Sequence, residues 1–180
     1  MVERMLWENS TATAIACRTI ALSLRKNYVE EVFLFGLLHD LGKLVMMRQI
    51  RAEYIKVVEQ VGKGRTFIEA EEAILGFGHP LVGALVAKKW NFPPETCQII
   101  KHHHEALPAG LTNLADEKRV IVQLGDLLAH ALGYGHPPGY PSQQDALLNT
   151  AAFLGISPAA LEKLHEETKH VFDDTGAAFM

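Results

Sequence analysis

The chain has 180 residues, of which 48% are hydrophobic and 21% are charged. This composition excludes an intrinsically disordered protein and predicts that residues 1–180 form a single domain with its own core. The net charge of −4 argues against a protein that binds nucleic acid, and no apolar run approaches the ~20 residues of a membrane span. Two cysteines and the lack of a signal peptide indicate a cytoplasmic protein.

Hydrophobic side chains recur at helical spacing along most of the chain. In chain order, this spacing predicts helices over Leu6–Leu24, Tyr28–Met47 with an interruption at Gly42, Arg51–Val61, Thr66–Leu75, Leu81–Trp90, Glu95–His104, Glu117–Leu132, Gln144–Leu154 and Ser157–His170. Two stretches, Leu107–Asp116 and the Gly- and Pro-rich Gly133–Ser142, are expected to be loops. No segment alternates as a strand would, so we expect an all-α domain, a compact bundle of eight or nine helices.

One acidic residue interrupts an apolar helix next to a histidine. His39 and Asp40 follow Phe35–Leu38 and precede Leu41. A buried carboxylate must be paired or must bind a cation, because unpaired burial costs several kcal/mol or more. Imidazole and carboxylate together suit iron, manganese or zinc. The alternative is a carboxylate that caps a helix or pairs locally.

Three further features point to the same chemistry. His79 stands at a predicted helix start after two glycines, and His102–His104 end another helix. Successive helical residues point about 100° apart, so two of the three histidines can line one cleft while the third faces solvent. Asp126 lies in the apolar helix before Leu132, where pairing with a nearby basic residue is the alternative. His130, one turn further on, is expected to have a solvated or core role.

These residues lie in an order that resembles a known family. The string Leu37–Leu44 is similar to the signature of the HD superfamily of metal-dependent phosphohydrolases. The order of Gly76–Ala84, Trp90–Pro93 and Ile99–His104 is similar to its regulatory branch, the HDOD (HD-related output) domains. The resemblance runs from about Leu6 to Leu132. The N-terminal helical half of such domains is not recognised here, so we expect a fragment or a shortened relative.

The resemblance implies a metal centre and names its ligands. The implied ligands are His39 and Asp40 from the HD pair, Asp126, and the three histidines that serve the second metal of the related HD-GYP phosphodiesterases, His79, His103 and His104. Lys43 matches a lysine that faces the substrate phosphate in those enzymes. Asn9 stands where the superfamily has a histidine ligand. The string Gly139–Pro141 reads Gly-Tyr-Pro but lies 35 residues after His104, and we interpret it as a chance match.

Three functions remain open on this basis. The first is an HDOD-type signalling module that binds one or two divalent transition metal ions, iron or manganese, and acts on an unidentified signalling protein without efficient catalysis. Asp40 is then expected to bridge the ions, and His102 to lie outside the cleft. The second is a phosphohydrolase acting on a nucleotide or cyclic dinucleotide, with Lys43 contacting the phosphate. The third is a metal-free helical interaction domain.

Overall fold

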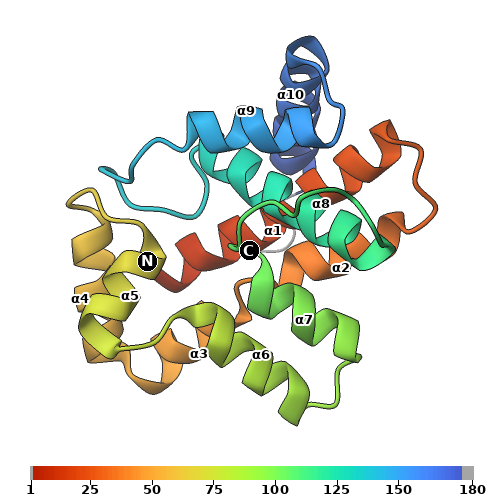
Figure 1. Cartoon of the computed structure of the whole chain (residues 1–180). Helices are drawn as coiled ribbons and strands as arrows, with labels where there is room; N and C mark the ends of the chain where they lie inside the picture. The colour runs from red at the N-terminus through yellow and green to blue at the C-terminus, as the bar shows by residue number, and fades with distance from the viewer. Residues whose placement is uncertain (1, 176–180) are drawn as a thin grey trace.

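The computed structural model describes residues 2–175, and within that range every regular element is a helix (Figure 1). The helices are α1 (Val2–Ser23), α2 (Val29–Leu38), α3 (Leu41–Gln49), α4 (Arg51–Val61), α5 (Phe67–Leu75), α6 (His79–Lys89), α7 (Pro94–His102), α8 (Leu114–Ala131), α9 (Gln144–Phe153) and α10 (Pro158–Thr175). The all-α fold predicted from the periodicity is therefore confirmed. None of these helices combines the length and apolar character that crossing a membrane requires.

The described residues form ten helices rather than eight or nine, because the predicted Tyr28–Met47 helix is two helices. The break falls at His39 and Asp40 and not at Gly42, which lies inside α3. Two turn residues separate α2 from α3. His39 keeps helical backbone angles, whereas Asp40, with φ −97° and ψ 15°, leaves the helical path. A second difference is the start of α8 before Glu117, where the side chain of Asn113 accepts a hydrogen bond from the backbone N–H of Asp116 at 2.8 Å.

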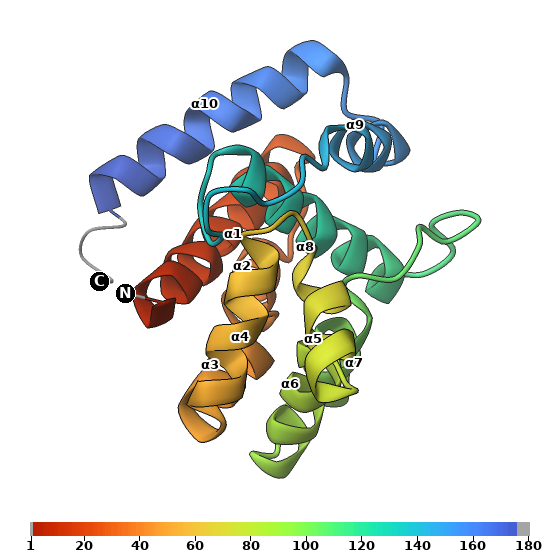
Figure 2. The ribbon, with the colours of Figure 1, turned by 90° about the vertical axis from the view of Figure 1, so that its left-hand side faces the viewer.

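Helix α1 runs through the middle of the molecule and packs against α2, α8 and α10 (Figure 2). Small side chains allow this close packing, since Ala12, Ala14, Ala16 and Cys17 are fully buried. At Gly36 of α2, an added Cβ would lie 2.9 Å from the Cα of Ala14, so α2 can approach α1 only without a side chain there. Helices α9 and α10 cover the side of α1 and α8 that faces away from α3 and α6 (Figures 1 and 2).

Helices α3 and α6 cross at a pair of glycines. A Cβ on Gly42 would lie 2.0 Å from the carbonyl oxygen of His79, and a Cβ on Gly83 would lie 3.0 Å from the backbone nitrogen of Gly42. Real Cβ atoms do not approach other atoms so closely, so this crossing depends on glycine. It holds the start of α3, next to Asp40, against the start of α6 at His79.

We predict that Gly42→Ala lowers the free energy of unfolding by about 2–3 kcal/mol or more, because the added methyl group forces the two helices apart. The higher helix propensity of alanine offsets only about 1 kcal/mol of this loss. Urea denaturation followed by circular dichroism measures the change. The control is Gly110→Ala, a loop position where an added Cβ meets nothing within 4 Å. Equal stabilities of the two variants would contradict the tight crossing.

Candidate metal centre

The structure brings all six predicted ligands together. They come from four places: His39 and Asp40 from the turn between α2 and α3, His79 from the start of α6, His103 and His104 from the end of α7, and Asp126 from the middle of α8. Five of them are buried, and His104 is the exposed member of the set. Their role as metal ligands remains a prediction, but their side chains converge.

The six side chains form two groups that share one carboxylate. In the first group, His39 Nε2 lies 3.3 Å from Asp126 Oδ1 and 3.4 Å from Asp40 Oδ2. In the second, His79 Nε2 lies 3.1 Å from Asp40 Oδ1. Asp40 therefore presents one oxygen to each group, which is the arrangement expected of a carboxylate that bridges two ions.

The second group is completed by the paired histidines at the end of α7. His79 Nε2 lies 3.4 Å from His103 Nε2 and 3.1 Å from His104 Nε2, and His103 Nε2 lies 3.8 Å from Asp40 Oδ1. His102 points elsewhere, because its Nδ1 pairs with the carboxylate of Glu105 near the surface. His103 and His104 thus line the centre and His102 does not, as expected.

Hydrogen bonds to Nδ1, on the far side of the rings of His39 and His103, fix which nitrogen faces the centre. His39 Nδ1 lies 2.6 Å from the carbonyl oxygen of Gly36, and His103 Nδ1 lies 2.7 Å from that of Ile100. A carbonyl can only accept, so each Nδ1 carries a hydrogen, and a ring without a second hydrogen presents an Nε2 lone pair to the centre. Metal-binding histidines are held in the same way by outer hydrogen bonds.

Glu71 gives His79 the same support, and the sequence analysis missed it. Its Oε2 accepts hydrogen bonds from both Nδ1 and the backbone N–H of His79, each at 2.7 Å, and its Oε1 accepts one from Tyr54 at 2.8 Å. The residue is fully buried. The signal available in the sequence was spacing. Glu71 lies four residues after Phe67 and three before Ile74, which places a charged residue on the apolar face of α5. A capping box of Thr66 and Glu69 begins this helix.

Lys43 and Asn9 donate hydrogen bonds to the two buried aspartates. Lys43 Nζ donates to Asp40 Oδ2 at 2.7 Å and lies 4.2 Å from the ring centre of Phe67. Asn9 Nδ2 donates to Asp40 Oδ2 at 2.9 Å and to Asp126 Oδ1 at 3.1 Å. Burial alone would raise the pKa of Asp40, but the charges of His39, Lys43 and His79 hold that pKa well below its ordinary value.

The donor set fits a transition metal. Imidazole nitrogens and carboxylate oxygens without a thiolate suit iron, manganese or zinc. Asp40, His79, His103 and His104 offer ligand atoms that all lie within 4.8 Å of one another, and so do His39, Asp40 and Asp126. Burial, followed by the charge of His104, holds the pKa of His103 well below its ordinary value, so this ring is neutral and able to ligate near pH 7.

A small pocket opens beside the second group. It has a volume of about 240 Å³ and is lined by residues that include Lys43, Phe67, His104, Tyr140 and Gln143. Tyr140 belongs to the Gly139–Pro141 string that we interpreted as a chance match. The long loop after α8 nevertheless brings it next to the centre, where its ring lies 6.1 Å from that of Phe67.

Comparison with known proteins gives a family and a fold. The sequence pattern of the HDOD domain family matches residues 2–106. An HDOD domain protein of unknown function from Geobacter sulfurreducens is 24% identical, with a TM-score of 0.68 over 97% of this chain and 60% of its own. A protein from Marinobacter aquaeolei, provisionally named a signal transduction protein, is 19% identical, with a TM-score of 0.71 over 98% of this chain and 38% of its own.

A third crystal structure carries the name of an enzyme. It is a protein from Shewanella amazonensis, provisionally named a phosphohydrolase, which is 21% identical with a TM-score of 0.66 over 94% of this chain and 60% of its own. At these identities the likeness shows the fold alone. The present chain spans three fifths or less of the length of each of these structures.

We predict that Glu71→Gln weakens metal binding about 10- to 100-fold, because a second-layer hydrogen bond to a ligating histidine contributes on that scale. The variant keeps the size of the side chain and removes its charge. Isothermal titration with Mn²⁺ measures the affinity. Glu72→Gln changes the adjacent exposed residue of α5 and is the matched control. Equal affinities in the two variants would show that Glu71 does not support a metal ligand.

Proposed function

Because the chain belongs to the HDOD domain family, as its match over residues 2–106 shows, we propose that it is a signal-transduction domain that binds one or two divalent transition metal ions. Iron and manganese are the metals that its ligand set favours. The bound ions join helices that are distant in the sequence. Their binding or release is the signal that a partner protein reads.

The observation that carries this proposal is the convergence of ring nitrogens. The Nε2 atoms of His79 and His103 lie 3.4 Å apart, while both Nδ1 atoms face groups that only accept hydrogen bonds. With neutral rings, two lone pairs therefore point at each other next to the carboxylate of Asp40. Such an arrangement is repulsive unless a proton or a cation lies between the nitrogens. A divalent ion removes the repulsion and binds both rings at once.

A metal at this position would couple distant parts of the fold. Its ligands come from the α2–α3 turn, α6, the end of α7 and α8, so its binding free energy adds to the stability of their contacts. Loss of metal would loosen the packing of those helices against one another. A partner that distinguishes the two packings would then bind one of them more tightly.

Two contacts favour signalling over efficient catalysis. Asn9 places an amide where the superfamily has an imidazole, and the amide already donates to both aspartates. The ammonium of Lys43 is buried against Asp40 and Phe67, so it is not free to face a substrate without rearrangement. The relative named as a signal transduction protein supports the same reading.

A second candidate function is hydrolysis of a nucleotide or cyclic dinucleotide phosphate. The observation that favours it is the 240 Å³ pocket, which Lys43 and His104 both line, and one structural relative bears the name of a phosphohydrolase. In such a reaction a divalent ion supplies charge that acidifies water and stabilises the phosphoryl oxygens. Lys43 would bind a phosphate oxygen from the pocket wall if it left Asp40.

We predict that the purified protein, reconstituted with Fe²⁺ or Mn²⁺, holds close to stoichiometric metal, and that Asp40→Asn loses most of it. Asp40 is shared by both groups, so its replacement affects every ion. Elemental analysis of the desalted protein gives the metal content. Asp145→Asn changes an exposed aspartate of α9 and is the control. Metal below about a tenth of an equivalent in the wild type, or full metal in Asp40→Asn, would contradict the proposal.

We further predict that the metal-loaded protein hydrolyses cyclic di-GMP and common nucleotides slowly or not at all. Efficient hydrolysis requires open metal positions for water and phosphate, and Asn9 and Lys43 already contact the bridging aspartate. Chromatography of the reaction products over several hours measures turnover. A rate near the ~10 s⁻¹ that is usual for enzymes would make the phosphohydrolase the better description.

A further inference from the structure

The two candidate ligands from the end of α7 lie outside the regular helix. Helix α7 ends at His102, and His103 and His104 occupy the turn that follows. The last four carbonyl groups of a helix have no partner within it, so other groups of the protein must bind them. Inside this turn, the backbone N–H of Glu105 donates to the carbonyl oxygen of His102 at 3.0 Å. The turn otherwise depends on contacts from outside α7.

Arg119 of α8 supplies most of these contacts. It is buried, and its guanidinium donates at 3.3 Å to three backbone carbonyl oxygens, which belong to His102, Glu105 and Ala106. Gln123, one helical turn further along α8, donates to the carbonyl oxygen of Glu105 at the same distance. The accepting residues lie on both sides of the two ligand histidines. The backbone that carries the two imidazoles is therefore held from α8.

We propose that Arg119 is a positioning residue for the second ion: it holds the turn after α7 so that the imidazoles of His103 and His104 face the second group. This inference rests on the metal binding proposed above and adds a residue that touches no metal ligand atom. It also makes α8 the element that links the two groups, because the same helix supplies Asp126 to the first.

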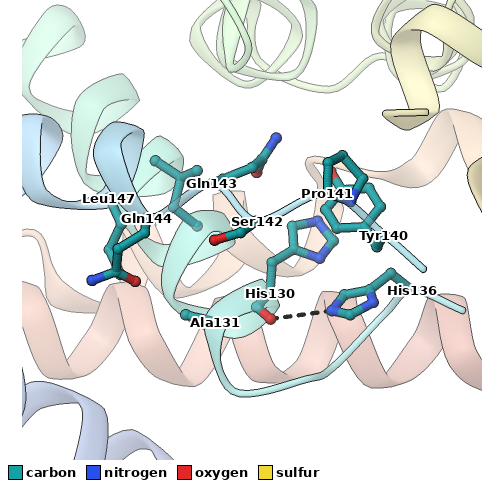
Figure 3. A pocket seen from close by; sticks show the side chains of 10 residues that line it. His130, Ala131, His136, Tyr140, Pro141, Ser142, Gln143, Gln144 and Leu147 are labelled. Atoms are coloured by element: carbon teal, nitrogen blue, oxygen red, sulfur yellow. Dashed lines mark hydrogen bonds between the residues drawn. The ribbon is translucent and has the colours of Figure 1, made fainter. Parts of the chain in front are cut away.

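Helix α8 suits this role because its own position is fixed by other contacts. It packs against α1, α2 and α9 as well as α7. At Gly125 an added Cβ would lie only 2.6 Å from the sulfur of Cys17 on α1. At the other end of α8, the carbonyl oxygen of His130 lies 3.1 Å from Nε2 of His136 in the following loop (Figure 3). Arg119 thus ties a turn to a helix that is held along its length.

The neighbouring Lys118 holds the opposite end of α7. It is buried, and its Nζ lies 3.0 Å from a carboxylate oxygen of Glu95, in the first turn of α7. The same ammonium pairs with Glu31 of α2. Both basic residues therefore join α8 to α7 and carry the same charge. They differ in the end of α7 that they hold, which makes Lys118 the matched control for Arg119.

The direction of the effect separates positioning from electrostatics. A guanidinium repels a metal cation, so loss of the Arg119 charge would by itself strengthen metal binding. Arg119 lies seven residues before Asp126, which is about 10 Å along α8, and screening weakens the repulsion at that range. Positioning predicts the opposite result. Without the guanidinium, the turn loses three hydrogen bonds, the imidazoles lose their common direction and metal binding weakens.

The test compares Co²⁺ binding by the wild type, Arg119→Met and Lys118→Met. Methionine keeps much of the length of either side chain and removes its charge and its donors. Expected for Arg119→Met are at least about a tenfold loss of affinity for one cobalt ion, the scale of support to a ligating histidine, and an altered visible spectrum of the bound cobalt. Lys118→Met should keep the wild-type affinity and spectrum.

Circular dichroism checks that each variant is folded. Arg119→Lys replaces any Arg119→Met sample that is not, because it keeps the charge but an ammonium lacks the planar fork that binds several carbonyls at once. The same loss of affinity and the same change of spectrum are expected from it.

The outcomes separate the two proposals. If the wild type binds no Co²⁺, Mn²⁺ or Fe²⁺, the metal-binding function itself is wrong. If the wild type binds cobalt and the Arg119 variant binds it as tightly or more tightly, only the role of Arg119 is wrong. A lower affinity with an unchanged spectrum, or equal losses in the Arg119 and Lys118 variants, would also contradict positioning. Either result would show a general loosening of α7 rather than displaced histidine ligands.

Discussion

An excess of buried negative charge is the constraint on which the rest of this structure depends. Asp40, Glu71 and Asp126 are all buried. The buried ammonium of Lys43 interacts electrostatically with all three carboxylates. Three carboxylates against one ammonium leave two negative charges to be balanced by protonated histidines or by a cation. Leaving them unbalanced would cost several kcal/mol for each charge. One divalent ion would supply the missing charge.

The helical framework is arranged around that charge. The Gly42–Gly83 crossing brings the start of α3 against the start of α6, and this contact places His79 Nε2 next to Asp40. The turn between α2 and α3 takes the backbone of Asp40 out of helical geometry, and the side chains of His39 and Asp40 both face the centre. Glu71 of α5 then holds His79 from behind. Few of these features would benefit an ordinary apolar core, which suggests that the fold is adapted to the centre.

Much of the centre could be predicted because its residues conflict with their local surroundings. Asp40 and Asp126 are charged residues in apolar helices. The angle between successive helical residues predicts that two of the three histidines share a cleft, and the resemblance to the HD superfamily identifies them as His103 and His104. The break at His39 and Asp40 was missed, because the glycine at position 42 is the stronger local signal for an interruption. Its use is a close helix crossing, which only the packed structure shows.

Glu71 was missed for a related reason. It lies on the apolar face of α5, but sequence periodicity cannot say what the opposite helix or loop presents to it. The contact of Glu71 with His79 spans the turn between α5 and α6, and the ring of His130 is held by Tyr140 from a loop that composition alone marks as exposed. Long-range contacts of this kind are fixed by packing and not by local sequence.

The account depends on whether metal occupies the space between the converging imidazoles, and an anomalous diffraction experiment tests this most directly. Crystals grown with Mn²⁺ would be measured on both sides of the manganese absorption edge. We expect an anomalous peak within bonding distance of Asp40 and of Nε2 of His79 or His39. The contradicting result is a map without a peak there, in which Nε2 of His79 instead donates a hydrogen bond to Asp40 and Lys43 remains its buried counter-ion.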